Sequence, residues 1–92
     1  MSSQLITEPD IVDSENLSIL LINADENVLE LIVASCRNMD RDFNFYLCNE
    51  VTDPTWFSRA MTKSDKIFKN PTVEEVYAFL KAKNQEMFSD NK

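Results

Sequence analysis

The hydrophobic and polar positions of the chain change period several times, and each period predicts one element. Residues 17–22 form an apolar run of strand length that is interrupted only by Ser18, so we expect a buried strand there. From residue 28 to residue 36, apolar side chains recur at helical spacing. Asp25 precedes this stretch as an N-cap, and the predicted helix runs to about Asn38.

The next two segments repeat the order of strand and helix. Residues 43–48 alternate between two faces, which predicts a second strand. Asp53 is a favourable N-cap, and Pro54 fits the first turn of a helix without the loss of a hydrogen bond. We therefore expect a second helix that ends near Lys63.

A third strand and a third helix complete the pattern. Residues 66–69 predict a short strand, and Thr72 with Glu75 has the spacing of a capping box that opens the last helix. Three strands that alternate with three helices predict a small α/β domain with parallel strands and right-handed crossovers. We expect this single domain over residues 17–92, preceded by an acidic arm over residues 1–16.

Two aromatic residues are expected to have different environments. Trp56 shares an apolar helix stripe with Ala60 and Met61, so we place it in the core. Tyr46 falls on the outward face of the second strand and is expected to be available to a partner. The inner face of the last helix is expected to consist of Val73, Val76, Tyr77 and Leu80.

The composition is that of a small acidic protein, with 92 residues and a formal net charge of -7. The sequence contains no histidine, which is the commonest general base and the usual metal ligand. It also contains no glycine, so a glycine-rich phosphate-binding loop is excluded. We therefore expect a binding protein rather than an enzyme, with no cofactor or metal ion. The acidity argues against direct contact with nucleic acid or anionic membranes. No segment approaches the about 20 apolar residues of a membrane span, and no signal sequence is evident, so we expect a cytoplasmic protein.

Cys36 and Cys48 are the two cysteines of the chain. Their spacing matches neither a zinc site nor a C-x-x-C redox motif. We expect two buried, reduced thiols, with a disulfide or a reactive thiol as the alternatives.

The charge is distributed unevenly along the chain. Residues 37–92 contain equal numbers of acidic and basic residues, so the net charge of -7 belongs to residues 1–36, which contain no lysine or arginine. This segment is either a solvated arm followed by a favourable helix start, or a surface that presents carboxylates to a basic partner. The carboxylates concerned are Glu8, Asp10, Asp13, Glu15, Asp25, Glu26 and Glu30.

Residues 18–32 resemble the first strand and helix of a response-regulator receiver domain. In that family an acidic pair after the strand binds magnesium, and Asp25 with Glu26 would be the pair here. Lys69 near Pro71, before a helix rich in glutamate, is also similar to a receiver. The chain is shorter than a receiver, and none of its predicted strands ends in a phosphoacceptor aspartate. We therefore expect a partly receiver-like fold without the phosphorylation chemistry.

The acidic helix offers a spacing close to that of DNA phosphates. Glu26 and Glu30 are one helical turn apart, about 6 Å along the axis. Phosphates two steps apart on one strand of B-DNA are separated by about 6.8 Å. Carboxylates on a rigid helix, continued by residues 8–15, thus imitate a row of phosphates.

In its size, its acidity and the carboxylates of residues 1–15 and 23–30, the chain resembles the Arn anti-restriction proteins of T-even bacteriophages. The resemblance covers the whole chain, although the near-neutral C-terminal part departs from a uniformly acidic mimic. It implies a dimeric DNA mimic with a curved negative surface. The implied target is a host restriction endonuclease that attacks DNA containing modified cytosines, in the cytoplasm of the infected cell.

Two functions follow as hypotheses. The first is a DNA-mimic inhibitor of a basic DNA-binding host protein, in which the carboxylates named above replace phosphates. The second is a non-catalytic receiver-like adaptor that binds a protein through its last helix or a sheet edge, with Tyr46 or Met87 and Phe88 in contact. A small chain has a thin stability margin, so we also expect a homodimer. Possible extensions of the mimicking surface are Asp40, Asp42, Glu50 and Asp53.

Overall fold

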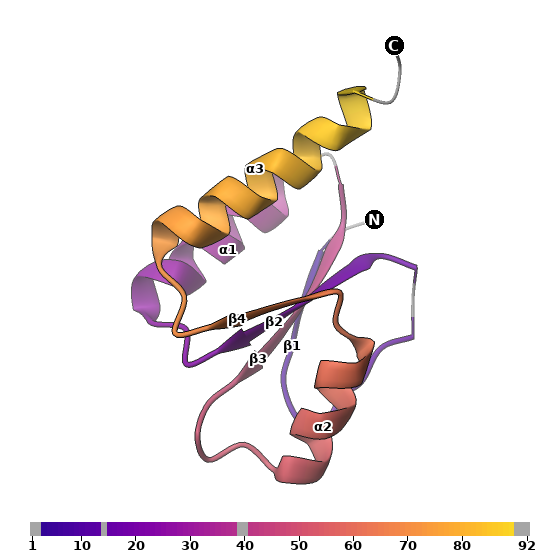
Figure 1. Cartoon of the computed structure of the whole chain (residues 1–92), viewed down its shortest axis with the longest axis vertical. Helices are drawn as coiled ribbons and strands as arrows, with labels where there is room; N and C mark the ends of the chain where they lie inside the picture. Colours follow the sequence, from indigo (N-terminus) through magenta and orange to yellow (C-terminus); the bar gives the residue numbers. More distant parts are fainter. Residues whose placement is uncertain (1–2, 14, 39–40, 90–92) are drawn as a thin grey trace.

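A parallel four-stranded sheet forms the centre of the molecule, with helices on both of its faces (Figure 1). The structure is a computed structural model that describes residues 3–13, 15–38 and 41–89, with side chains up to residue 84. The elements in chain order are β1 (Gln4–Ile6), β2 (Leu17–Ile22), α1 (Glu26–Asn38), β3 (Phe43–Cys48), α2 (Pro54–Lys63), β4 (Lys66–Lys69) and α3 (Val73–Ser89).

The predicted α/β class is confirmed, but the sheet has four strands rather than three. The additional strand, β1, lies within the segment that we expected to be an acidic arm, and it pairs in parallel with β3 in a register that sets Leu5 opposite Phe45. Its three residues are too few for a periodic pattern, and Ile6 is the buried one among them. The strand is defined by its pairing with a segment about forty positions away in the chain, which local pattern does not encode.

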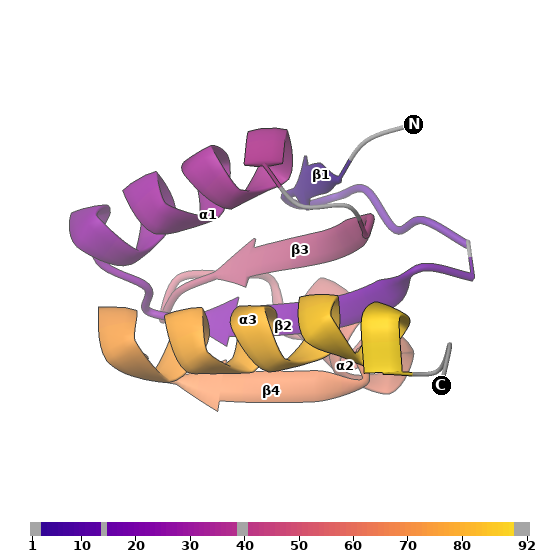
Figure 2. The same ribbon diagram turned by 90° about the horizontal axis from the view of Figure 1, so that it is seen from above.

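The strand order across the sheet is β1-β3-β2-β4. Figure 2 shows α1 and α3 side by side over one face, with α2 on the other face. The chain therefore leaves β2 and β3 toward opposite faces of the sheet. In open parallel sheets, ligands bind at the carboxyl ends of strands near the point where the strand order reverses. In this sheet that point lies between the carboxyl ends of the neighbouring strands β2 and β3.

Each face of the sheet has its own core. Trp56 is buried, as predicted, and belongs to the layer under α2. The core beneath α1 and α3 consists of Ile19, Leu21, Val28, Ile32, Phe43, Phe45, Phe68, Val76 and Leu80. The core beneath α2 consists of Ile6, Leu20, Tyr46, Cys48, Trp56 and Ala60.

The prediction that Tyr46 is available to a partner is wrong. Its side chain is fully buried, its ring packs edge-on against Trp56 at a centroid distance of 6.0 Å, and its hydroxyl binds the backbone of Val12. Alternation along β3 suggested one solvated face, but an interior parallel strand is covered on both.

The predicted helix starts are confirmed by their capping bonds. The amide of Val28 donates to Oδ1 of Asp25 at 3.0 Å. The Thr72 amide donates to the Glu75 carboxylate and the Glu75 amide donates to the Thr72 hydroxyl, both at 3.2 Å, which is the reciprocal pattern of a capping box.

Four positions in the apolar stripes predicted for the helices are exposed. Val33, Met61, Val73 and Tyr77 expose 40%, 42%, 37% and 52% of their surface. The apolar stripe of each helix is wider than the arc that contacts the sheet. In α3, Phe79 reaches the core instead, edge-on to Phe68 at a centroid distance of 5.5 Å.

Candidate partner-binding surface

Because the strands are parallel, the loops that follow them meet at one edge of the sheet, called here the carboxyl edge. Helices α1, α2 and α3 begin at this edge. Three separate segments, after β1, β2 and β3, bring predicted phosphate surrogates to it, all of them exposed. These carboxylates are Glu8, Asp25, Glu26, Glu50 and Asp53.

Basic residues gather at the opposite edge, where the strands begin. Arg37 and Lys63 lie in the last turns of α1 and α2, and Lys66 begins β4. This separation has a physical cause, because acidic residues are favourable at helix N-termini and basic residues at C-termini, and parallel α/β units align all the helix dipoles. Lys69 ends β4 at the carboxyl edge, at the far side of the sheet from Glu8.

The carboxyl edge is held together by contacts between distant segments. The amide of Asp53 donates to Oε2 of Glu8 at 3.1 Å, and Oδ1 of Asp53 accepts from the amide of Thr55 at 2.8 Å to cap α2. The segment after Glu8 is attached to α2 because the indole of Trp56 donates to the carbonyl of Asp10 at 2.8 Å. The carboxylates of Glu8 and Asp53 are thus positioned on a supported backbone.

The exposed side of α1 continues the acidic surface. Glu26 and Glu30 border a shallow groove of about 410 Å³ whose apolar residues are Leu29, Val33 and Ala34 and whose far end is Arg37. The two carboxylates lie one helical turn apart on this side, as the spacing predicted.

A smaller cavity of about 250 Å³ lies between the start of α1 and the ends of β2 and β3. Its apolar walls include Leu21, Leu29 and Leu47, and its polar residues include Asn23, Asn49 and Glu8. The lining comes from β2, α1, β3 and the loops that follow β1, β2 and β3, so no local sequence pattern indicates the cavity. Sequence reasoning did not find it.

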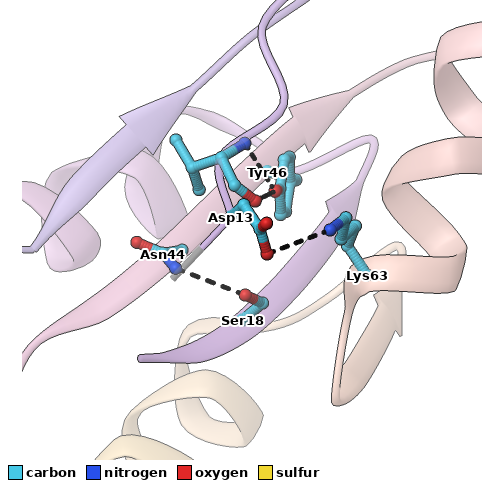
Figure 3. Close-up of polar contacts among 6 residues, drawn as sticks. Asp13, Ser18, Asn44, Tyr46 and Lys63 are labelled. Carbon is cyan, nitrogen blue, oxygen red and sulfur yellow. Dashed lines mark hydrogen bonds and ion pairs between the residues drawn. The ribbon is translucent and has the colours of Figure 1, made fainter. Parts of the chain in front are cut away.

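Other predicted surrogates are not brought to the carboxyl edge. Asp13, Glu15 and Asp42 lie where the strands begin. Asp13 forms an ion pair with Lys63, with 3.3 Å between Oδ1 and Nζ (Figure 3). Asp40 lies outside the described residues.

The ends of β2 and β4 are joined by a pair of asparagines that the sequence analysis did not single out. Asn23 and Asn70 have positive φ angles of 59° and 49°. The Asn23 side-chain amide donates to Oδ1 of Asn70 at 3.3 Å, and the Asn70 amide donates to the carbonyl of Ile22 at 2.9 Å. An asparagine directly after an apolar run was the available signal, because asparagine tolerates the left-handed region better than most residues.

The two cysteines are free thiols, and they lie in different layers. Cys36 packs against the core beneath α1 and α3, while Cys48 belongs to the core beneath α2. Burial raises the pKa of both thiols, and a hydrogen bond with Ser3 partly opposes this for Cys36. A raised pKa keeps a thiol protonated and unreactive at neutral pH.

Within residues 3–13, 15–38 and 41–89, no group of three or more Cys, Asp or Glu side chains has a metal-binding arrangement. Asp25, the first member of the receiver-like acidic pair, caps α1 instead. The described helices include none long and apolar enough to cross a membrane. Comparison with models of protein families, with curated proteins and with solved structures gives no match to this chain.

Proposed function

We propose that this protein is an acidic DNA mimic that inhibits a basic DNA-binding host protein, a restriction endonuclease that cleaves DNA with modified cytosines, by occupying its DNA-binding surface. The observation that carries the proposal is the gathering of exposed carboxylates at the carboxyl edge and along α1, away from most of the described basic residues. These carboxylates are Glu8, Asp25, Glu26, Glu30, Glu50 and Asp53.

The support beneath these carboxylates favours mimicry over a loose acidic tail. Asp25 and Asp53 cap helices, and Glu8 accepts a hydrogen bond from the backbone of Asp53. A partner therefore meets charges that are already in place, so association loses less side-chain entropy than it would with a flexible tail.

As proposed, the protein functions in the cytoplasm of the host cell, does not bind nucleic acid itself, and needs no cofactor or catalytic group. It acts as a homodimer, which extends the negative surface beyond one small domain.

The test is a nuclease-protection titration. Modified-cytosine DNA, its restriction endonuclease and increasing amounts of this protein are combined at two salt concentrations, with a separate measurement of binding to DNA. We expect protection at low salt that weakens at high salt, because screening reduces attraction between exposed charges. Full cleavage at a large excess of protein would reject this target.

Matched charge reversals locate the surface. The double variant Glu26→Lys with Glu30→Lys is expected to weaken inhibition about 100-fold, since each close charge pair across an interface contributes about 1.5 kcal/mol or more. The control, Glu15→Lys with Asp42→Lys, makes the same change in net charge at the opposite edge. Equal losses in both variants would mean that net charge matters and the carboxyl edge does not.

A second candidate is an adaptor that binds a protein partner through α3. The observation that favours it is the exposure of Tyr77 and Val73 near the start of that helix, at 52% and 37%. Such binding would be insensitive to salt and reduced by Tyr77→Ala, whereas the DNA-mimic proposal expects Tyr77→Ala to inhibit like the wild type.

A further inference from the structure

The cavity at the carboxyl edge combines two kinds of lining that suit one class of ligand. Its walls include the side chains of Leu21, Leu29 and Leu47, and Glu8 is the charged residue that lines it. A volume of about 250 Å³ is below the about 300–1,000 Å³ of sites for drug-sized ligands. The cavity therefore suits a side chain or a small molecule of similar size.

The chemistry of the lining favours an aliphatic chain that ends in a cation. Long basic side chains place their methylene groups along apolar surface and keep the charged end near water or a carboxylate. Here the leucines supply the apolar surface, while Glu8 has two carboxylate oxygens, one of which accepts from the Asp53 amide. Asn49 also lines the cavity, and its Oδ1 accepts from the amide of Val51 at 3.0 Å.

The local electrostatics decide the sign of the ligand's charge. The N-terminus of α1, which borders the cavity, carries the equivalent of about half a positive charge and by itself favours an anion. Asp25 and Glu26 lie at that terminus, and Glu8 lines the cavity, so full negative charges outweigh the helix dipole. A cation is favoured.

We infer that this cavity is an anchor pocket for one lysine or arginine side chain of the protein that binds the carboxyl edge. The inference rests on the proposed function and names a contact that DNA itself does not offer, because a phosphate backbone has no apolar pocket for the methylene groups. The pocket adds a part of the binding energy that salt does not screen.

The test uses small probes in place of the partner. Nα-acetyl-lysine amide and Nα-acetyl-arginine amide are titrated into ¹⁵N-labelled protein, with Nα-acetyl-norleucine amide as the neutral control of similar shape. We expect weak, saturable binding of the two basic probes, with the largest shifts at the amides of Asn23, Asn49 and Thr52, which line the cavity. Norleucine amide is expected to bind at least fivefold more weakly.

Two variants address the two halves of the lining. Glu8→Gln keeps an oxygen that accepts from Asp53 and is expected to lower lysine-amide affinity about fivefold, while Glu15→Gln, which removes one charge elsewhere, is expected to leave it unchanged. Ala24→Leu adds volume in the lining and is expected to abolish binding. If Ala24→Leu fails to fold, the Glu8→Gln variant and the norleucine probe still test whether the cavity binds a basic side chain.

Equal binding of norleucine and lysine amides, shifts spread over other surfaces, or equal effects of Glu8→Gln and Glu15→Gln would overturn the inference. Failure of the proposed function is distinguishable from this. Specific lysine-amide binding without nuclease protection would reject the proposed target and support the pocket. Nuclease protection without localised binding of the probes would reject the pocket and support the target.

Discussion

The indole nitrogen of Trp56 donates a 2.8 Å hydrogen bond to the backbone carbonyl of Asp10, across 46 positions of the chain. Together with the bonds between the Tyr46 hydroxyl and the backbone of Val12, it attaches the connection between β1 and β2 to the layer under α2. Ile11 and Val12 pack against the same core. An acidic segment that composition alone describes as an arm is thereby part of the folded domain, and Glu8 is positioned with it.

Removal of the Tyr46 hydroxyl should weaken this attachment. In Tyr46→Phe, the amide and carbonyl of Val12 lose their partner, and we expect the free energy of unfolding to fall by about 1–2 kcal/mol. Urea denaturation gives the stability, and hydrogen exchange of the Val12 amide gives the local effect. The matched control is Tyr77→Phe, which alters a half-exposed tyrosine and should leave both unchanged.

The carboxylate of Asp53 has a structural and a charge role that substitution can separate. Asp53→Ala removes the N-cap of α2 and should destabilise the protein by about 1 kcal/mol. Asp53→Asn retains a capping oxygen, so its stability should be close to that of the wild type. Because it loses a negative charge at the carboxyl edge, it should inhibit the restriction endonuclease less well than the wild type does. Thermal unfolding and the nuclease assay are measured on both. A stability loss in Asp53→Asn as large as in Asp53→Ala would contradict the separation.

A polar row crosses three strands near their N-terminal ends. The Asn44 side-chain amide donates to the Ser18 hydroxyl at 3.4 Å (Figure 3). The Gln4 side-chain amide donates to Oδ1 of Asn44 at 3.3 Å. Asn44 is fully buried, so Asn44→Leu should cost about 1–3 kcal/mol by leaving Ser18 without this partner. Gln4→Ala, at an exposed position, should change the unfolding free energy by less than about 0.5 kcal/mol. Urea unfolding of the two variants compares them directly.

The raised pKa values of Cys36 and Cys48 predict a loss of stability at alkaline pH. Burial favours the neutral thiol in the folded state, so the contribution is fully present below the ordinary thiol pKa and is lost as the pH rises through the raised folded value. Urea unfolding at a series of pH values above neutrality measures this. The variant with Cys36→Ala and Cys48→Ala serves as the reference, and its unfolding free energy should fall less steeply with pH. Parallel curves for the two proteins would show that other groups cause the loss.

Much of the fold is readable from local pattern. The strand at residues 17–22, the Asp25 and Asp53 caps and the capping box of Thr72 and Glu75 all lie where the sequence indicates, because each depends on residues within a few positions of one another. The fourth strand was not readable in this way, since three residues form a strand only when β3 is beside them.

The sequence by itself determined the α/β class, the helix starts and the net negative charge, because periodicity, capping and composition are local or additive properties. Only the tertiary structure decided which carboxylates share a surface. Parallel strands bring Glu8, Asp25 and Asp53 to one edge and leave Glu15 at the other, although Glu8 and Glu15 are close in the chain. It also buried Tyr46 and formed the cavity beside α1. Both outcomes depend on contacts between residues far apart in sequence, where packing and backbone pairing, rather than local preference, decide the position of a side chain.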